Sequence, residues 1–297
     1  MNRFKKFLDP WEYARFVEPF FIDKARDPEK PQLFILGLPR SGTTLVYQYV
    51  VHRLDVAYFS NGVGRYPFSP FLITWWQTRR YGTYQSDFQS VYGKVLGPVA
   101  PREAGGFWAR FFDLDAYSSY PDVDRVAQVQ LKKTIAALQS VFGGAPFVNK
   151  NVKHMLRLDA LAKIFPAAVF LVVEREMTDV ALSVLRGRIR YQPDPQGWWS
   201  VKPPNYHRLR GLSVVEQVAG QVLALAERME VDLENIEPRR VMRLTYQDFC
   251  SAPDGFITDL RALLDYPKYR NPACSAFSVV SNQPENDQEK QLIELLQ

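Results

Sequence analysis

The stretch GLPRSGTTL, residues 37–45, decides the fold. It follows a short apolar run at 33–36 that predicts a buried strand, and it opens a segment at 43–53 that predicts a helix. Glycines in such a loop let the backbone close around an anion, and the helix N-terminus supplies free N–H groups. The stretch therefore predicts a phosphate-binding loop between a parallel strand and a helix.

The loop departs from the nucleotide-hydrolase pattern G-x-x-x-x-G-K-[ST] at one position. Gly37, Gly42 and Thr44 fit the pattern. Thr43 stands where the pattern has lysine, and the cation of the loop is Arg40. Since the missing lysine would carry the charge at the γ-phosphate, we expect the loop to bind a phosphate-like group without hydrolysing ATP.

The composition is that of a globular protein. The chain has 297 residues with 46% hydrophobic and 23% charged residues, which excludes a disordered chain, a collagen-like fibre and a coiled coil. Two cysteines and three histidines are too few for a disulfide framework or a His-based metal centre, so we expect no metal. Basic and acidic residues are interleaved, so the net charge of +5 predicts no nucleic-acid partner.

The first 30 residues predict a helical extension, because apolar residues recur at roughly helical spacing from Phe4 to Phe16. The segment lacks the apolar core of a secretory signal, and the chain lacks a run of about 20 apolar residues that could cross a membrane. We therefore expect a cytoplasmic protein. Packing of the helix on the body is favoured over a membrane-surface helix, because Pro10 breaks the amphipathic pattern, and peripheral contact with a membrane surface stays open.

Apolar runs and amphipathic segments alternate along the rest of the chain, which predicts an α/β fold with a parallel sheet. Strands are expected at 33–36, 147–148, 169–173 and 240–244, and helices at 43–53, 126–142, 155–165, 180–188, 214–229 and 256–264. The stretches 65–110 and 191–207 are irregular, and one is rich in aromatic residues while the other is rich in proline. Such excursions predict lids or acceptor-binding segments.

A second group of residues follows the strand predicted at 169–173. Arg175 lies just past its carboxyl end, and Ser183 lies in the next helix. Both could face the crevice where open α/β sheets bind ligands, and an arginine with a hydroxyl makes a phosphate clamp. Taken alone, the two residues are better explained by structural roles.

Together, PRSGTT and a strand followed by R-x7-S resemble the sulfotransferases that use 3′-phosphoadenosine-5′-phosphosulfate (PAPS). The resemblance covers most of the chain and implies one three-layer α/β/α domain of the P-loop type over residues 1–297. In that family the first loop holds the 5′-phosphosulfate, and the later arginine and serine hold the 3′-phosphate. The residues implied for these two roles are Arg40, Ser41, Gly42, Thr43 and Thr44, and then Arg175 and Ser183.

Two further segments carry the same resemblance. FVNKN, residues 147–151, looks like the strand end that bears the family's catalytic lysine, which implicates Lys150. MRLTYQDF, residues 242–249, looks like the strand ending in Y-E-D-L, whose tyrosine contacts the adenine, which implicates Tyr246. Arginine at position 40 resembles the carbohydrate, protein-tyrosine and bacterial branches more than the branch that acts on small phenols and steroids.

The general base is where the chain departs from the family. The protein-tyrosine branch has a glutamate at the place of Ser60 or Asn61, and the small-phenol branch has a histidine at the place of Val152. None of these three side chains can take a proton. The base must therefore come from another segment.

Glu103 is the first candidate base and His154 is the second. Glu103 lies in GPVAPREAGGFW, residues 97–108, which looks like the GP-x-E-x-G-x-x-W segment of bacterial members. Burial in this aromatic segment could raise its pKa. A solvated loop acid paired with Arg102 is an equally good interpretation of the same spacing.

The resemblance implies in-line transfer of a sulfuryl group from PAPS to a hydroxyl or amine acceptor, leaving adenosine 3′,5′-bisphosphate. Arg40 and Lys150 would neutralise the charge on the transferred group and the leaving oxygen. The acceptor is expected to be a small molecule, a carbohydrate or a lipid, and the oligomeric state has no signal. Two alternatives stay open: an atypical P-loop kinase with Glu174 as metal-binding acid, and a non-catalytic nucleotide-binding protein of the same fold.

Overall fold

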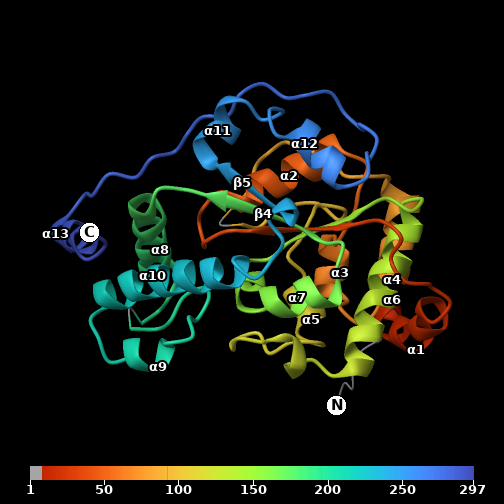
Figure 1. Ribbon diagram of the computed structural model, residues 1–297, viewed down its shortest axis with the longest axis horizontal. Coiled ribbons are helices and arrows are strands. Elements are labelled where there is room, and N and C mark those ends of the chain that lie inside the picture. Colours follow the sequence, from red (N-terminus) through yellow and green to blue (C-terminus); the bar gives the residue numbers. More distant parts are fainter. Residues whose placement is uncertain (1–8, 92, 195) are drawn as a thin grey trace, which may run out of the picture.

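The computed structural model describes residues 9–91, 93–194 and 196–297 (Figure 1). A five-stranded, all-parallel sheet with the order β2-β3-β1-β4-β5 forms its centre. The strands are β1 (Gln32–Leu36), β2 (Ala57–Tyr58), β3 (Phe147–Lys150), β4 (Val169–Glu174) and β5 (Val241–Thr245). Because β1 lies between β3 and β4, the loop that follows β1 lies beside the carboxyl ends of both neighbours.

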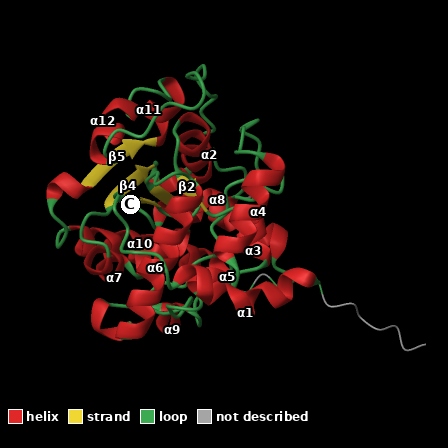
Figure 2. Cartoon of the chain, turned by 90° about the vertical axis from the view of Figure 1, so that its right-hand side faces the viewer, coloured by secondary structure: helices red, strands yellow, loops and turns green. Residues whose placement is uncertain are grey.

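Helices cover both faces of the sheet, because successive side chains of each strand point to opposite faces. On one face, Leu33 and Ile35 pack against α2 (Thr43–Arg53), α11 (Tyr246–Ser251) and α12 (Ile257–Leu263). On the other face, Phe34 and Leu36 pack in a core shared with the helices α6 (Arg125–Val141), α7 (Leu158–Ile164), α8 (Met177–Tyr191) and α10 (Val214–Leu233). Figure 1 shows α2 and α12 above the strands and α7 and α10 below them, and Figure 2 shows the strands enclosed by helices. The three-layer α/β/α architecture is confirmed.

The strands and helices expected from periodicity are present, the helix at 43–53 with the expected bounds and the others with shifted ends. The strand expected at 147–148 extends to Lys150, and the helix expected at 180–188 is the longer α8. The helix expected at 155–165 is a 3₁₀ turn, Val152–Leu156, followed by α7. The remaining short elements are α3 (Asn61–Arg65), α5 (Gly105–Trp108), α9 (Tyr206–Leu209), α13 (Asp287–Glu294) and the 3₁₀ turns Tyr120–Asp122 and Pro238–Arg240.

The stretch 65–110 is less irregular than expected, because it contains the helix α4 (Pro70–Tyr81). Pro70 stands at the first helical position, where its missing N–H removes no hydrogen bond. Ile73 faces the core while Trp75 is exposed, so the apolar residues of α4 form no one-sided stripe. The usual sign of a surface helix was therefore absent from the sequence.

The N-terminal helix is confirmed within the described residues as α1 (Pro10–Ile22), whereas Phe4 lies outside them. The side chain of Asp9 accepts a hydrogen bond from the N–H of Trp11 at 3.1 Å and caps the helix. Pro10 occupies the first helical position, so it starts the helix instead of breaking it. The helix packs against α4 through Trp11 and Trp76, whose ring centroids are 5.2 Å apart.

Candidate active site

The predicted phosphate loop joins β1 to α2 and depends on two glycines. Gly37 and Gly42 have φ values of +149° and +96°, which favour glycine. A Cβ atom on Gly37 would lie 2.7 Å from the carbonyl oxygen of Val173 in β4. A Cβ atom on Gly42 would lie 2.3 Å from the ring of Tyr246. The glycines therefore allow β4 and Tyr246 to approach the loop closely.

Two polar features of the loop are unsatisfied within the described residues. Helix α2 begins at Gly42 without a side-chain cap, so its first N–H groups face the loop. The hydroxyl of Ser41 is buried and has no hydrogen-bond partner there. A buried polar group without a partner is costly, and an anionic oxygen in the loop would satisfy both features. The loop therefore fits a phosphate group.

The other residues predicted for nucleotide binding gather beside the loop. Arg40 Nε donates a hydrogen bond to Ser183 Oγ at 3.0 Å, and Arg175 Nη1 donates one to the carbonyl oxygen of Arg40 at 3.0 Å. The guanidinium carbon of Arg175 lies 4.7 Å from the ring centroid of Tyr246, and burial raises the pKa of that tyrosine to about 12. We call Arg40, Arg175, Ser183 and Tyr246 the arginine cluster. Its members come from the loop, the end of β4, α8 and the start of α11.

Two contacts of the arginine cluster were not predicted. Asp179 Oδ2 lies 3.6 Å from Arg175 Nε, and the carboxylate also accepts the N–H of Asn282. Arg175 Nη2 donates to the carbonyl oxygen of Val280, so the C-terminal segment contacts the cluster. An acid four residues after an arginine is a recognisable spacing that would have indicated Asp179. The contact with Val280 involves only its backbone and leaves no pattern of side chains.

Lys150 and Glu103, the predicted catalytic lysine and first candidate base, form an ion pair. Lys150 ends β3 opposite Ile35 of β1, close to the phosphate loop. The lysine side chain is 3% exposed and the glutamate side chain is 34% exposed, so the acid is the more accessible member of the pair. Arg102 Nη1 donates instead to Asn61 Oδ1 at 3.0 Å. The partner of Glu103 is therefore Lys150, not Arg102.

A cavity of about 220 Å³ opens beside Glu103. Its lining residues are Asn61, Gly93, Lys94, Val95, Pro101, Arg102 and Glu103. A Cβ atom built on Gly93 would lie 3.5 Å from the hydroxyl oxygen of Thr44, so one wall of the cavity approaches the phosphate loop. The cavity therefore offers space between the loop and the candidate base.

His154, the second candidate base, lies in the core with no exposed surface. Its Nε2 atom lies 2.9 Å from Asn149 Oδ1, which also accepts a hydrogen bond from Trp108 Nε1 at 3.0 Å. Burial, with the charges of Arg157 and Lys150, lowers the pKa of His154 well below its ordinary value. The imidazole is therefore neutral, and its Nε2 atom contacts the side chain of Asn149 in the core.

The kinase alternative depends on Glu174 as a metal-binding acid. Glu174, at the end of β4, pairs with Arg243 Nη1 at 2.6 Å on the β5 side of the sheet. Within residues 9–91, 93–194 and 196–297, no three His, Cys, Asp or Glu side chains are grouped so that they could hold a metal ion.

The same part of the chain contains no helix with the length and apolar character needed to span a membrane.

The family model described as the sulfotransferase family matches residues 31–270. The chain belongs to the sulfotransferase family. The matched range contains all five strands, the arginine cluster and the ion pair of Lys150 with Glu103. The family predicted from the motifs is thus confirmed, and sulfuryl transfer is the activity that this membership supports.

Solved sulfotransferase structures share the fold of this chain. Sulfotransferase STF1 from Mycobacterium tuberculosis H37Rv superposes with a TM-score of 0.55 at 14% identity, covering 96% of this chain and 75% of that one. Sulfotransferase STF9 from Mycobacterium avium gives a TM-score of 0.53 at 14% identity, covering 96% and 71%. At this identity the likeness shows the fold alone. The comparison with curated proteins gives no match.

Proposed function

We propose that this sulfotransferase transfers a sulfuryl group from PAPS to a hydroxyl group, with Glu103 as the general base. The observation that carries the proposal is the arrangement around the phosphate loop. The arginine cluster lies on the side of β4, and the ion pair of Lys150 with Glu103 lies on the side of β3. A donor anion and an acceptor hydroxyl therefore have separate places on either side of one loop.

The donor side supplies cations and hydroxyl groups for an anion with two phosphate positions. We assign the 5′-phosphosulfate to residues 40–44, and the unpartnered hydroxyl of Ser41 supports this assignment. We assign the 3′-phosphate to Arg175 and Ser183, both of which contact Arg40. Tyr246 packs on Gly42 and beneath Arg175, which supports its assignment to the adenine.

The reacting side pairs a buried cation with an accessible acid. Bound PAPS supplies the activated sulfuryl group. Lys150 donates a hydrogen bond toward the bridging oxygen, and Arg40 balances charge on the sulfuryl oxygens. Glu103 faces the cavity and accepts the proton of the acceptor hydroxyl. We place Glu103 before His154 as the base because the imidazole has no exposed surface.

The cavity limits what part of an acceptor can approach the base. Its volume of about 220 Å³ is below the roughly 300–1,000 Å³ of pockets that enclose drug-sized ligands. A small acceptor therefore fits beside Glu103 as a whole. Of a carbohydrate or lipid, only the reacting end fits, and most of the molecule stays outside the cavity.

A thermal-shift titration with adenosine 3′,5′-bisphosphate tests the donor side, with ATP and Mg²⁺ as the comparison ligand. A ligand at 100 times its Kd stabilises the folded state by about 2.7 kcal/mol. We expect the bisphosphate to give this shift in the wild type and in the exposed control Arg208→Ala, and to lose it in Arg175→Ala. Stabilisation by ATP and Mg²⁺ alone would contradict the proposal and favour the kinase.

Glu103→Gln tests the base. We expect transfer from ³⁵S-labelled PAPS to a panel of hydroxyl acceptors to fall by about 10²–10⁴. Binding of the bisphosphate should be unchanged, because Glu103 lies outside the arginine cluster. The matched control is Glu174→Gln, whose acid pairs with Arg243 and should be dispensable. Near-normal sulfuryl transfer by Glu103→Gln would mean that another group is the base. His154 would then be tested next.

A further inference from the structure

Helix α1 turns an aromatic stripe toward solvent. Tyr13, Phe16, Val17 and Phe20 recur on one side of the helix and are 53%, 68%, 53% and 63% exposed. A surface helix normally buries such a stripe against the body of the protein. The packing expected from the sequence is therefore reversed over this part of α1.

The opposite side of α1 is fixed to the protein by a buried carboxyl group. Glu18 is 2% exposed, and its carboxylate accepts the N–H groups of Phe71 and Leu72 at the start of α4, the latter at 3.1 Å. Trp11 packs on Trp76 of the same helix. Rolling α1 to bury the stripe would break these contacts and leave the α4 N-terminus uncapped. The outward position of the aromatic residues is thus enforced by the fold.

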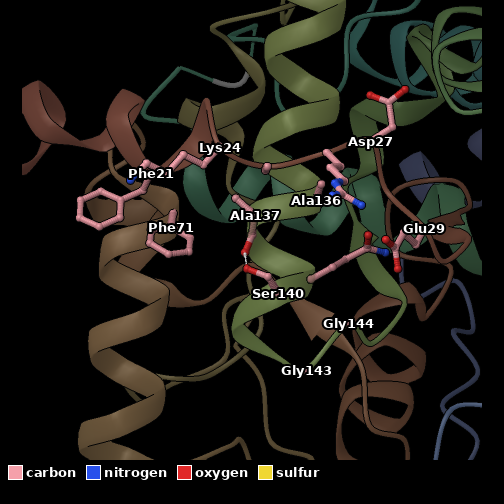
Figure 3. A pocket seen from close by; sticks show the side chains of 13 residues that line it. Phe21, Lys24, Asp27, Glu29, Phe71, Ala136, Ala137, Ser140, Gly143 and Gly144 are labelled. Carbon is pink, nitrogen blue, oxygen red and sulfur yellow. Dashed lines mark hydrogen bonds between the residues drawn. The ribbon is translucent and has the colours of Figure 1, made fainter.

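The apolar surface continues onto α4. Phe21 stacks on Phe71 with ring centroids 5.5 Å apart, and Trp75, one turn further along α4, is 41% exposed. We call Tyr13, Phe16, Val17, Phe20, Phe21 and Trp75 the aromatic face. Figure 3 shows Phe21 and Phe71 together at one side of a cavity of about 510 Å³. This cavity also borders Gly143 and Gly144, before β3, and so lies at the opposite edge of the sheet from the phosphate loop.

Basic side chains lie directly over rings of this face. Arg15 lies 4.8 Å from the ring centroid of Phe16, and Lys24 lies 3.9 Å from that of Phe20. Arg79 lies 4.4 Å from the ring centroid of Trp75. Exposed aromatic rings with cationic groups beside them are the combination that inserts at a lipid–water interface while the charges meet anionic headgroups.

We infer that the aromatic face docks on the surface of a bilayer that contains anionic lipids. The rings enter the headgroup region, and Arg15, Lys24 and Arg79 contact the lipid phosphates. Helix α4 connects this surface to the active site. Its Gln77 donates a hydrogen bond to the carbonyl oxygen of Pro98 at 3.0 Å, in the segment that leads to Glu103. Helix α4 therefore links the docked face to the segment that carries Glu103.

Vesicle co-sedimentation tests docking without any assay of the reaction. The probes are vesicles of phosphatidylcholine alone and of phosphatidylcholine with phosphatidylglycerol, at low and high salt. We expect the full chain to bind the anionic vesicles, and less tightly at high salt. The double variant Phe16→Ser with Phe20→Ser should bind them at least about tenfold more weakly, because two large apolar side chains no longer leave water.

Three controls make the result specific. Tyr266 is 66% exposed and lies outside the aromatic face, so Tyr266→Ser should bind like the wild type. Arg15→Gln with Lys24→Gln should lower binding to the anionic vesicles and reduce its salt dependence. Unchanged thermal unfolding of the Phe16 and Phe20 variant would show that the fold is intact, as expected for exposed positions.

Two outcomes would overturn the inference. One is wild-type protein that binds neither type of vesicle, or aromatic variants that bind as well as the wild type. The other is a concentration-dependent dimer, seen by sedimentation velocity, that the Phe16 and Phe20 substitutions abolish. The face would then be an interface between two copies of this chain. Neither result depends on PAPS binding or sulfuryl transfer, so this failure is distinguishable from failure of the proposed function.

Discussion

The donor and reacting sides of the site differ in how their cations are satisfied. On the donor side, Arg40 and Arg175 contact each other and bond to groups from three separate elements. On the reacting side, Lys150 has Glu103, but Arg157 behind it is 2% exposed with three guanidinium nitrogens that bond to nothing in the described residues. One region is preorganised by hydrogen bonds, and the other contains a buried charge whose guanidinium has no hydrogen bond within the described residues.

This difference indicates that the reacting side lowers the free energy of unfolding of the protein. Buried charges are normally paired, because desolvating an ion is costly. The guanidinium carbon of Arg157 lies 5.3 and 5.1 Å from the rings of Trp108 and Phe112, and the charge of Glu103 acts on it without a hydrogen bond. Ala104, next to Glu103, has a φ of +51°, and Arg40 of the donor side has a φ of +73°, both of which are strained for residues with side chains. Backbone strain is therefore common to both sides, and the buried charge of Arg157 is what distinguishes the reacting side.

Lys150→Met should have the largest effect, and it breaks the reacting side alone. We expect transfer from PAPS to fall by about a thousandfold, because the leaving oxygen loses its cation. Bisphosphate binding should change by less than about tenfold, since the arginine cluster is intact. The matched control is Lys153→Met, whose ammonium pairs with the exposed Asp115 at 2.8 Å. Equal losses of binding and transfer would instead mean that the two sides are one unit.

Gly42→Ala should break the donor side by forcing Tyr246 out of place. The new Cβ would lie 2.3 Å from the tyrosine ring, at a φ of +96° that alanine rarely adopts. Strain of about 1–3 kcal/mol corresponds to roughly a 5- to 150-fold loss of bisphosphate affinity. Gly105→Ala is the matched control, because its Cβ would meet no atom within 4 Å. Isothermal titration calorimetry measures both, and equal affinities for the two variants would contradict close packing of Tyr246 on the loop.

Arg157→Met should stabilise the protein, because it removes a buried cation that has no hydrogen bond within the described residues. Burial lowers the pKa of Arg157 to about 9 in the folded state, from an ordinary 12.5. A cation with a lowered pKa destabilises the fold fully below pH 9, and the penalty fades only as the pH rises from 9 toward 12.5. We therefore expect a gain of about 1–2 kcal/mol in the free energy of unfolding at pH 7.

Urea denaturation at pH 7 measures this change, with Arg240→Met as its control. Arg240 is bonded to the carbonyl oxygens of Ala168, Ala162 and Phe165, so its loss should destabilise the protein. A stabilised Arg157→Met that has also lost transfer would show that the charge serves the acceptor. A destabilised variant would show that Arg157 is compensated in solution by a bound anion or water.

The donor side was the more predictable from the sequence, for a physical reason. Its residues stand at the carboxyl ends of β1, β4 and β5, and a parallel sheet brings these ends to one edge. A strand, a glycine loop and a helix each have a local pattern. Positions 37–45 and Arg175 could therefore be placed together before the structure was known.

The reacting side and α1 were less predictable, because distant contacts position them. The segment that leads to Glu103 is positioned by Asn61, whose Nδ2 donates hydrogen bonds to the carbonyl oxygens of Val95 and Gly97 at 2.8 and 2.7 Å. Such contacts leave no periodic signal, so Lys150 could not be recognised as the partner of Glu103. Likewise, Glu18 caps another helix, which reverses the face of α1 that the hydrophobic pattern favours.

Ser183→Ala should have the smallest effect, and it measures how far the donor side acts as one unit. The substitution removes the oxygen that accepts a hydrogen bond from Arg40 Nε at 3.0 Å, a bond worth about 0.5–1.5 kcal/mol. Bisphosphate affinity should therefore fall by roughly 2- to 13-fold, and unfolding in the absence of ligand should change little.

Arg175 holds the same loop residue, Arg40, through the carbonyl oxygen of that residue. In the double variant with Arg175→Ala, the two losses should consequently not add, and an interaction energy above about 0.5 kcal/mol in the double-mutant cycle would show the coupling. Additive losses would mean that Arg40 is positioned independently by each neighbour, and the contrast with the reacting side would then be one of hydrogen-bond number, not of preorganisation.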